Sequence, residues 1–290
     1  MKTTLALLAL SVVTVLAADW PQYRGPSVDG STTEGIAIKW PKDGPPVLWK
    51  ATLGPSFGSF AVSGDRVFCF IQRAAGGEDK EVAIALDVKS GKELWAVSLG
   101  KATYDKQGGD GPRSTPTVDG QRVYVLGAYQ ILTCLNAADG KIVWQHDLVK
   151  EFGGKVIKWN NAASPILEGD LIFVNAGGAG QGLLAFEKSS GKVVWKGEDD
   201  LPTHSSPVPA TIHGVRQVIF FTQKGLVAVI PTTGKVLWRQ PYKFDVSTAS
   251  SPTCWTANCC ARIAKGCCIS MSTCWVRWPM PYWCCRPMPV

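Results

Sequence analysis

The chain is poor in charge, in histidine and in long apolar runs, and each shortage excludes a class of protein. Only 18% of its 290 residues are charged, and the basic residues behind the formal net charge of +7 are scattered, which argues against a nucleic-acid-binding stripe. After residue 18 no segment approaches the roughly 20 apolar residues of a membrane-spanning helix. Leucine-rich segments with a 3.6-residue period are also missing, which argues against an α/β fold.

Residues that bind metals or phosphates are equally sparse. The three histidines, His146, His204 and His213, are scattered, and no His-x-x-x-His pattern occurs. The glycine-rich stretches at 108–111 and 177–180 lack the Lys-Ser/Thr pair of a phosphate-binding loop. We therefore predict no catalytic residues and no metal ligands.

The N-terminus has the layout of a secretory signal. Lys2 is followed by an apolar run from Leu5 to Leu16 and by the small residues Ala17 and Ala18. Residues 1–18 are therefore predicted to be a signal peptide, and the chain an exported, periplasmic or extracellular protein without a stable membrane span. The alternative is that the apolar run stays as an uncleaved anchor.

A five-residue phrase, Gly-Lys-x-x-Trp, recurs four times, at residues 91–95, 140–144, 191–195 and 234–238. Together with Trp49, its tryptophans lie 43 to 51 residues apart, which is the length of a propeller blade. Within residues 115–144, short alternating runs are separated by Asp-Gly turns, as in four antiparallel strands. We predict an all-β fold over residues 49–252: a β-propeller of four-stranded antiparallel blades, incomplete, with about four to five blades present.

The phrase has a physical explanation. Its glycine suits a tight turn because it tolerates positive φ, and the indole offers a large apolar area with one N–H donor. We expect each tryptophan to wedge between neighbouring blades and to bond a turn carbonyl. Ser-Pro or Thr-Pro pairs, at 115–116, 164–165, 206–207 and 251–252, are expected to open the first strands, whose first residue need not donate to the sheet.

The segment from Ala85 to Trp95 closely resembles the tryptophan-docking motif of the pyrroloquinoline quinone (PQQ) repeat family. That family includes quinoprotein dehydrogenases, the propeller scaffold of the outer-membrane barrel assembly machinery, and exported bacterial proteins of unassigned role. The resemblance covers residues 49–252. Residues 19–26 and 111–120 resemble the third group. Residues 19–48 are predicted to form a Pro/Gly-rich strap that lies across a blade and buries Trp20. The alternative is a flexible leader.

The last forty residues change composition abruptly. Residues 253–290 hold eight of the ten cysteines, and six of them form adjacent pairs without the CxxC spacing of a zinc site. Read one base out of frame, residues 254–260 permit Leu-Asp-Gly-Glu-Leu-Leu, which resembles residues 118–123 of an earlier repeat. We interpret residues 253–290 as an aberrant, frameshifted tail; the alternative is a disulfide-rich appendix.

Candidate site residues precede two predicted first strands, where the loops of a propeller gather around its central channel. They are Arg113, Lys155, Trp159, Asn160 and Asn161. Arginine would bind an anion, tryptophan would stack and the amides would hydrogen-bond. The alternative is that Arg113 and Asn160 satisfy carbonyl groups of their own loops.

The leading functional hypothesis is a non-catalytic exported propeller that binds a protein or an envelope component. The family resemblance also implies a second hypothesis: a PQQ-dependent oxidoreductase, or a small-ligand sensor, whose site needs further C-terminal blades. Adjacent cysteines like those beside the quinone in PQQ dehydrogenases occur only in residues 253–290. No cofactor is therefore expected, with PQQ and calcium as the alternative.

Overall fold

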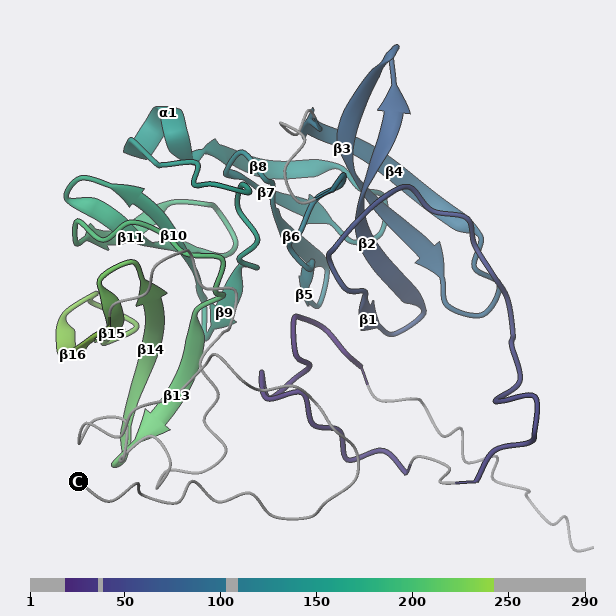
Figure 1. Cartoon of the computed structure of the whole chain (residues 1–290), viewed down its shortest axis with the longest axis horizontal. Helices are drawn as coiled ribbons and strands as arrows, with labels where there is room; N and C mark the ends of the chain where they lie inside the picture. Colours follow the sequence, from purple (N-terminus) through teal and green to yellow (C-terminus); the bar gives the residue numbers. More distant parts are fainter. Residues whose placement is uncertain (1–18, 36–38, 103–108, 243–290) are drawn as a thin grey trace, which may run out of the picture.

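The computed structural model describes residues 19–35, 39–102 and 109–242, so the predicted signal segment and the tail at 253–290 lie outside the described residues. Four antiparallel sheets of four strands fan out side by side, with one short helix at the edge (Figure 1). The predicted all-β, incomplete propeller of four-stranded blades is confirmed, and the described residues form four of these blades. Within the described residues no helix is long and apolar enough to cross a membrane.

Every blade has the same order, with the chain passing from the first to the fourth strand through tight hairpins. Blade 1 contains β1 (Ala61–Ser63), β2 (Arg66–Ala75), β3 (Glu78–Asp87) and β4 (Glu93–Lys101). Blade 2 contains β5 (Thr117–Asp119), β6 (Arg122–Leu126), β7 (Ile131–Asn136) and β8 (Ile142–Asp147), followed by helix α1 (Leu148–Phe152). Blade 3 contains β9 (Ile166–Glu168), β10 (Leu171–Gly178), β11 (Gln181–Glu187) and β12 (Val193–Gly197). Blade 4 contains β13 (Val208–Ile212), β14 (Val215–Thr222), β15 (Gly225–Val229) and β16 (Val236–Pro241).

The hydrophobic core lies between blades. Alternate residues of one strand face opposite neighbours: Ile172 and Val174 of β10 pack in the cluster shared with blade 2, whereas Phe173 packs in the cluster shared with blade 4. All three side chains are at most 1% exposed. Burying one such side chain contributes roughly 1.5–3 kcal/mol, so each blade is stabilised mainly by the blades on either side.

Trp49 and the first three tryptophans of the repeated phrase reach the next blade along the chain. Their indole Nε1–H groups donate to turn carbonyls of the following blade, at 2.6 to 3.1 Å: Trp49 to Val88, Trp95 to Ala137, Trp144 to Lys188 and Trp195 to Pro231. Each ring also covers the glycine of that next turn. At Gly91, where φ is +69°, an added Cβ would lie 2.4 Å from the Trp49 ring. Both predicted roles are confirmed for the turn glycines and for these four tryptophans. Trp238, the last tryptophan of the phrase, instead donates to the side chain of Gln217 in its own blade, at 2.7 Å.

A β-bulge explains how one sequence phrase both exposes and buries neighbouring residues. In blade 1, Ala85 pairs with Trp95 while Leu86 pairs with Glu93, which leaves Leu94 as the extra residue. The same shift occurs before the tryptophan of every blade. The bulge turns the tryptophan toward the next blade and leaves Leu94 44% exposed.

The Ser/Thr-Pro pairs link the first strands into a chain of hydrogen bonds. The backbone N–H of Ser59 donates to Thr115 Oγ1, that of Thr115 to Ser164 Oγ, and that of Ser164 to Ser206 Oγ, at 2.9 to 3.0 Å. In blades 2 to 4 the proline directly precedes the first strand, as predicted. These bonds fix the position of each first strand relative to the first strand of the neighbouring blade.

The N-terminal segment at 19–30 crosses the first strands of all four blades. Trp20 exchanges two backbone hydrogen bonds with Val62 of blade 1, and the carbonyl of Pro21 accepts from the N–H of Val118 in blade 2. Val28 is buried with Ile166 of blade 3 and Val208 of blade 4. Trp20 itself is half-buried. Residues 19–30 therefore tie four blades together at one end of their innermost strands.

Candidate functional site

The predicted site residues lie at one end of the propeller, here called the loop end. This end carries the loops that lead from each fourth strand to the next blade, together with the hairpins between second and third strands. The Gly-Lys turns and the crossing segment 19–30 lie at the opposite end, here called the turn end. Side chains at the loop end therefore come from several blades.

Arg113 is held by its own loop. Its Nη1 donates to the carbonyl of Gly111 and its Nη2 to that of Gly109, both at 3.0 Å. The guanidinium carbon lies 5.3 Å from the centroid of the Phe57 ring, and the backbone N–H of Phe57 donates to Pro112. Arg113 thus joins the loop before blade 2 to the segment before blade 1. The residue as a whole is half-exposed.

The segment that holds the other four candidates is fastened mainly through its backbone. The carbonyl of Lys155 accepts from Gln130 Nε2 at 2.6 Å, and the N–H of Asn161 donates to Ala128 at 3.0 Å. The Asn161 side chain is buried and donates to the carbonyl of Ala163. The ammonium of Lys155, by contrast, is on an exposed side chain. Of these residues, Asn161 has a role in building the loop, and Lys155 presents its charge to solvent.

Trp159 and Asn160 adopt consecutive left-handed conformations, with φ of +65° and +62°. Such a conformation is common for asparagine and unusual for tryptophan, and costs of the order of 1–3 kcal/mol. The turn is closed by the N–H of Asn160, which donates to Ile157 at 2.9 Å. The result is a rigid kink that places the Trp159 indole, half-buried, at the loop end.

His204 connects the two groups of candidates, and the sequence analysis had not singled it out as a site residue. Its Nε2 lies 3.0 Å from the carbonyl of Lys158, and its ring centroid lies 6.1 Å from that of Trp159. Burial lowers the pKa of His204; the carbonyls of Lys158 and Asn160 oppose this shift, and the charge of Arg113 adds to it. The imidazole is therefore a neutral structural donor at neutral pH.

A signal for His204 exists in the sequence. Arg113 and His204 each stand two residues before the hydroxyl residue of a Ser/Thr-Pro pair, so they occupy the same position in the loops that lead into blades 2 and 4. Aligning the repeats on these pairs instead of on the tryptophans brings the two residues into register.

A second polar cluster at the loop end joins blades 3 and 4. Asp200 is buried, and its carboxylate lies 2.7 Å from Arg239 Nη1 and 3.4 Å from Lys224 Nζ. Arg239 also pairs with Glu198. Since all four residues bridge one loop to the last described blade, the cluster is a blade-to-blade tie. Among the residues that the structure describes, no group of three or more His, Cys, Asp or Glu could hold a metal ion.

Comparison with known proteins agrees with this architecture. A family model described as outer membrane protein assembly factor BamB matches residues 78–279. The chain belongs to the PQQ-like repeat β-propeller family. A curated member, the outer membrane protein assembly factor BamB of Yersinia pestis, is 24% identical over 209 residues, which is 68% of this chain and 48% of that protein. The chain thus spans about half the length of this family member.

Two solved structures illustrate the similarity of fold. BamB from Moraxella catarrhalis is 18% identical, with a TM-score of 0.48 over 69% of this chain and 55% of that one. The quinohemoprotein alcohol dehydrogenase ADHIIG from Pseudomonas putida HK5 is 16% identical, with a TM-score of 0.48 over 68% of this chain and 36% of that one.

Proposed function

We propose that the chain is an exported, non-catalytic propeller scaffold that binds another protein or a component of the cell envelope. Membership of the PQQ-like family and the similarity to an outer membrane protein assembly factor support this proposal. The N-terminal signal layout supports export.

The proposal rests mainly on the hydrogen bonds that the polar side chains at the loop end make. Two donors of Arg113, the amide of Asn161 and the imidazole of His204 are engaged with backbone carbonyls of the surrounding loops. Side chains that are bonded to backbone carbonyls in this way hold the loops in place. Arg113, Asn161 and His204 therefore do not form an acid–base pair that could transfer a proton to or from a substrate.

PQQ with calcium fits these residues poorly. A calcium ion needs several carboxylate and carbonyl oxygens directed at one point. At the loop end the buried Asp200 is paired with Arg239 and Lys224, and the buried Asn161 donates to its own loop. An oxidoreductase or a small-ligand sensor remains the alternative function, with a site completed by blades beyond the fourth.

The proposal is tested by two measurements on the purified full chain. In the first, photo-crosslinking in an envelope extract, followed by mass spectrometry, should yield the same protein in independent preparations. In the second, titration with PQQ and calcium, followed by dye-linked alcohol oxidation, should give neither saturable binding nor turnover. Calcium-dependent PQQ binding with turnover would replace the scaffold proposal by the oxidoreductase one.

A further inference from the structure

We infer that the loop end is a docking surface for an extended acidic peptide segment that also carries aromatic side chains. The inference rests on the proposed scaffold function and names its partner chemistry. Three cation–aromatic pairs form the surface: Lys101 with Tyr129, Arg113 with Phe57, and Lys158 with Trp159. These six residues are called the cation–aromatic surface below.

Each pair presents a positive charge beside an accessible ring. The Lys101 ammonium lies 4.5 Å from the centroid of Tyr129, and that of Lys158 lies 4.8 Å from a ring centroid of Trp159. Both lysines are exposed, Tyr129 and Trp159 are half-buried, and Phe57 is 59% exposed. A lysine whose ammonium already lies against a ring has lost part of its side-chain conformational entropy. Binding a carboxylate therefore costs less additional entropy.

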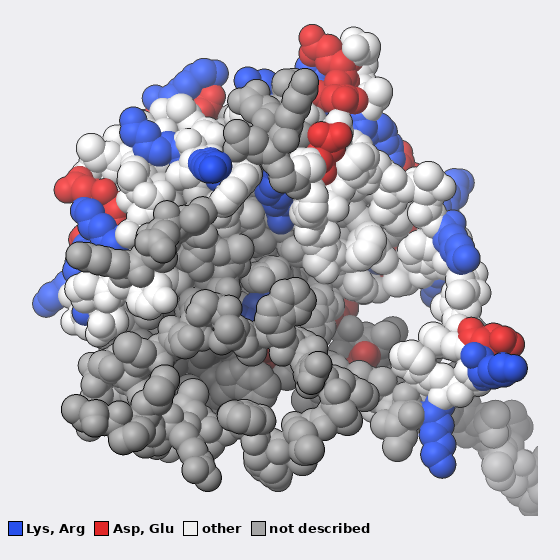
Figure 2. Space-filling model, viewed as in Figure 1, with Lys and Arg blue, Asp and Glu red and all other residues white. Residues whose placement is uncertain are grey.

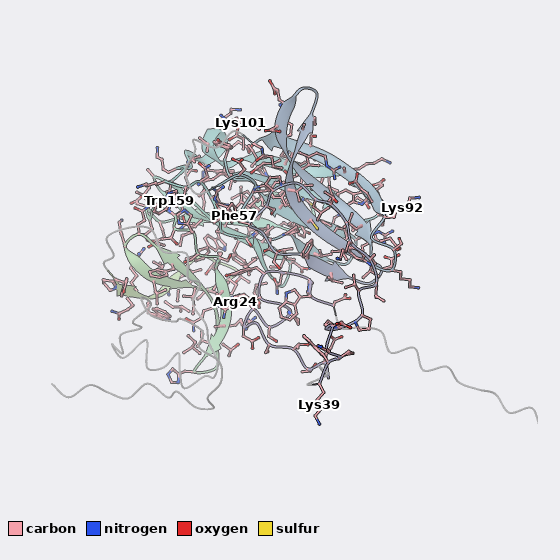
Figure 3. All side chains as sticks on the ribbon, turned by 45° about the vertical axis from the view of Figure 1, so that its right-hand side comes forward. Arg24, Lys39, Phe57, Lys92, Lys101 and Trp159 are labelled. Carbon is pink, nitrogen blue, oxygen red and sulfur yellow. The ribbon has the colours of Figure 1, made fainter. Side chains whose placement is uncertain are left out.

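The three pairs lie at the loop end, and hydrogen bonds connect some of the loops that carry them. Tyr129 precedes Gln130, whose side chain holds the carbonyl of Lys155, only three residues before Lys158. On the other side, His204 contacts both members of the Lys158–Trp159 pair, and it stands in the loop that leads into blade 4. In Figure 3, Lys101 lies above Trp159 and Phe57, and Arg24 of the crossing segment lies below all three.

The separation of the pairs favours a peptide over a compact anion. The three cations stand at different places in the chain: Lys101 ends β4, Arg113 lies in the loop before blade 2 and Lys158 in the loop before blade 3. A single phosphate or carboxylate could therefore engage one pair, whereas an extended chain carrying a carboxylate at every second residue could engage several. Tyrosine or phenylalanine side chains between the acids would pack against the edges of the rings.

Acidic groups beside the surface argue against a long polyanion. The backbone of Ala102, directly after Lys101, is bonded to Asp79 in the β2–β3 hairpin, whose tip also carries Glu78. Figure 2 shows acidic side chains at that hairpin and basic ones dispersed over the rest of the face, with no continuous basic stripe. A nucleic acid that followed the surface would meet these carboxylates, while a short acidic segment would end before them.

The experiment measures fluorescence polarisation of labelled twelve-residue peptides with the full chain. The probe alternates Glu and Tyr; one control peptide alternates Gln and Tyr, the other Glu and Ser. The variant Lys101→Glu/Lys158→Glu reverses two charges of the surface. Its matched control, Lys92→Glu/Lys192→Glu, makes the same charge change at two exposed lysines of the turn end, and Figure 3 shows Lys92 far from the surface.

The expected result is binding of the Glu-Tyr peptide that weakens at least tenfold in Lys101→Glu/Lys158→Glu and changes less than threefold in the turn-end control. Both control peptides should bind at least threefold more weakly, and added salt should weaken the Glu-Tyr complex. An equal loss in both variants, or equal binding of the Gln-Tyr peptide, would overturn the inference. Tighter binding of a twelve-nucleotide single strand, lost in the same variant, would assign the surface to nucleic acid instead.

The same variants separate this inference from the scaffold proposal. If Lys101→Glu/Lys158→Glu loses the peptide but still crosslinks to the protein that the wild type captures, the partner docks elsewhere, so the scaffold proposal stands and the inference is wrong. If the wild type binds the peptide but crosslinks to nothing, the scaffold proposal fails while the peptide site stands.

Discussion

The joint between blades 2 and 3 permits a sharp test of the tryptophan-docking interaction. Two side chains donate to one carbonyl: Trp144 Nε1 and Tyr124 Oη lie 3.1 and 3.0 Å from the carbonyl oxygen of Lys188. Burial raises the pKa of the Tyr124 phenol, so the hydroxyl keeps its proton at any working pH. Either donor alone can satisfy the carbonyl, and only the loss of both leaves it without a side-chain donor.

The single variants Trp144→Phe and Tyr124→Phe should each lower the free energy of unfolding by roughly 0.5–1.5 kcal/mol for the lost hydrogen bond, with a further loss of ring area for Trp144→Phe. The double variant removes both donors, and an unsatisfied carbonyl costs roughly 1–3 kcal/mol. We therefore expect the double variant to be less stable than the sum of the single losses by about 1 kcal/mol, because the turn is only partly shielded from water.

The measurement is urea unfolding of the four proteins, followed by far-ultraviolet circular dichroism, since this signal does not depend on tryptophan fluorescence. The control pairs Tyr124→Phe with Trp95→Phe. Trp95 packs on the opposite face of blade 2 and donates to Ala137, so these two losses should add within about 0.5 kcal/mol. Additive losses in the Trp144 cycle would refute the shared-carbonyl argument, as would equal coupling in the control cycle.

Three further predictions follow from single residues. Gly91→Ala should destabilise the chain by at least about 1 kcal/mol more than Gly64→Ala in urea unfolding, because both glycines have positive φ but only the first faces an indole ring. His204 has a lowered pKa in the folded state, so the unfolded chain takes up the proton first: stability should fall as pH drops below 6.5, and His204→Gln should reduce this fall in melting temperatures at pH 7.5 and 5.5. Burial raises the pKa of Cys69 and Cys134 to about 12, so mass spectrometry should find both thiols unmodified by iodoacetamide in the native chain and modified in urea; native labelling at either site would contradict their burial.

The fold was predictable because its signals are local and repeated. A turn glycine, a tryptophan and a Ser/Thr-Pro pair recur once per blade, and each has one physical use that does not depend on the rest of the chain. The β-bulge that exposes Leu94 is less visible, since an extra residue in a strand looks like ordinary alternation until the partner strand is known.

The candidate site was predictable only in part. Arg113 and the segment from Lys155 to Asn161 were selected by their place before first strands, and both lie at the loop end. Arg113 donates to carbonyls of its own loop, as the alternative interpretation of its role predicted. The carbonyl of Ala128, which accepts from the N–H of Asn161, could not be foreseen, because it is set by loop conformation and not by residue type.

By itself the sequence determined the blade repeat, its period and the residues that join one blade to the next, because these depend on contacts made the same way in every repeat. The tertiary structure alone decided the pairing of Lys101 with Tyr129, of Arg113 with Phe57 and of Lys158 with Trp159. These residues lie up to about a hundred positions apart in the chain, and only the stacking of blades around a common axis brings their loops to the same end. Cation–aromatic contacts of this kind have no period, so nothing in the sequence pattern marks them.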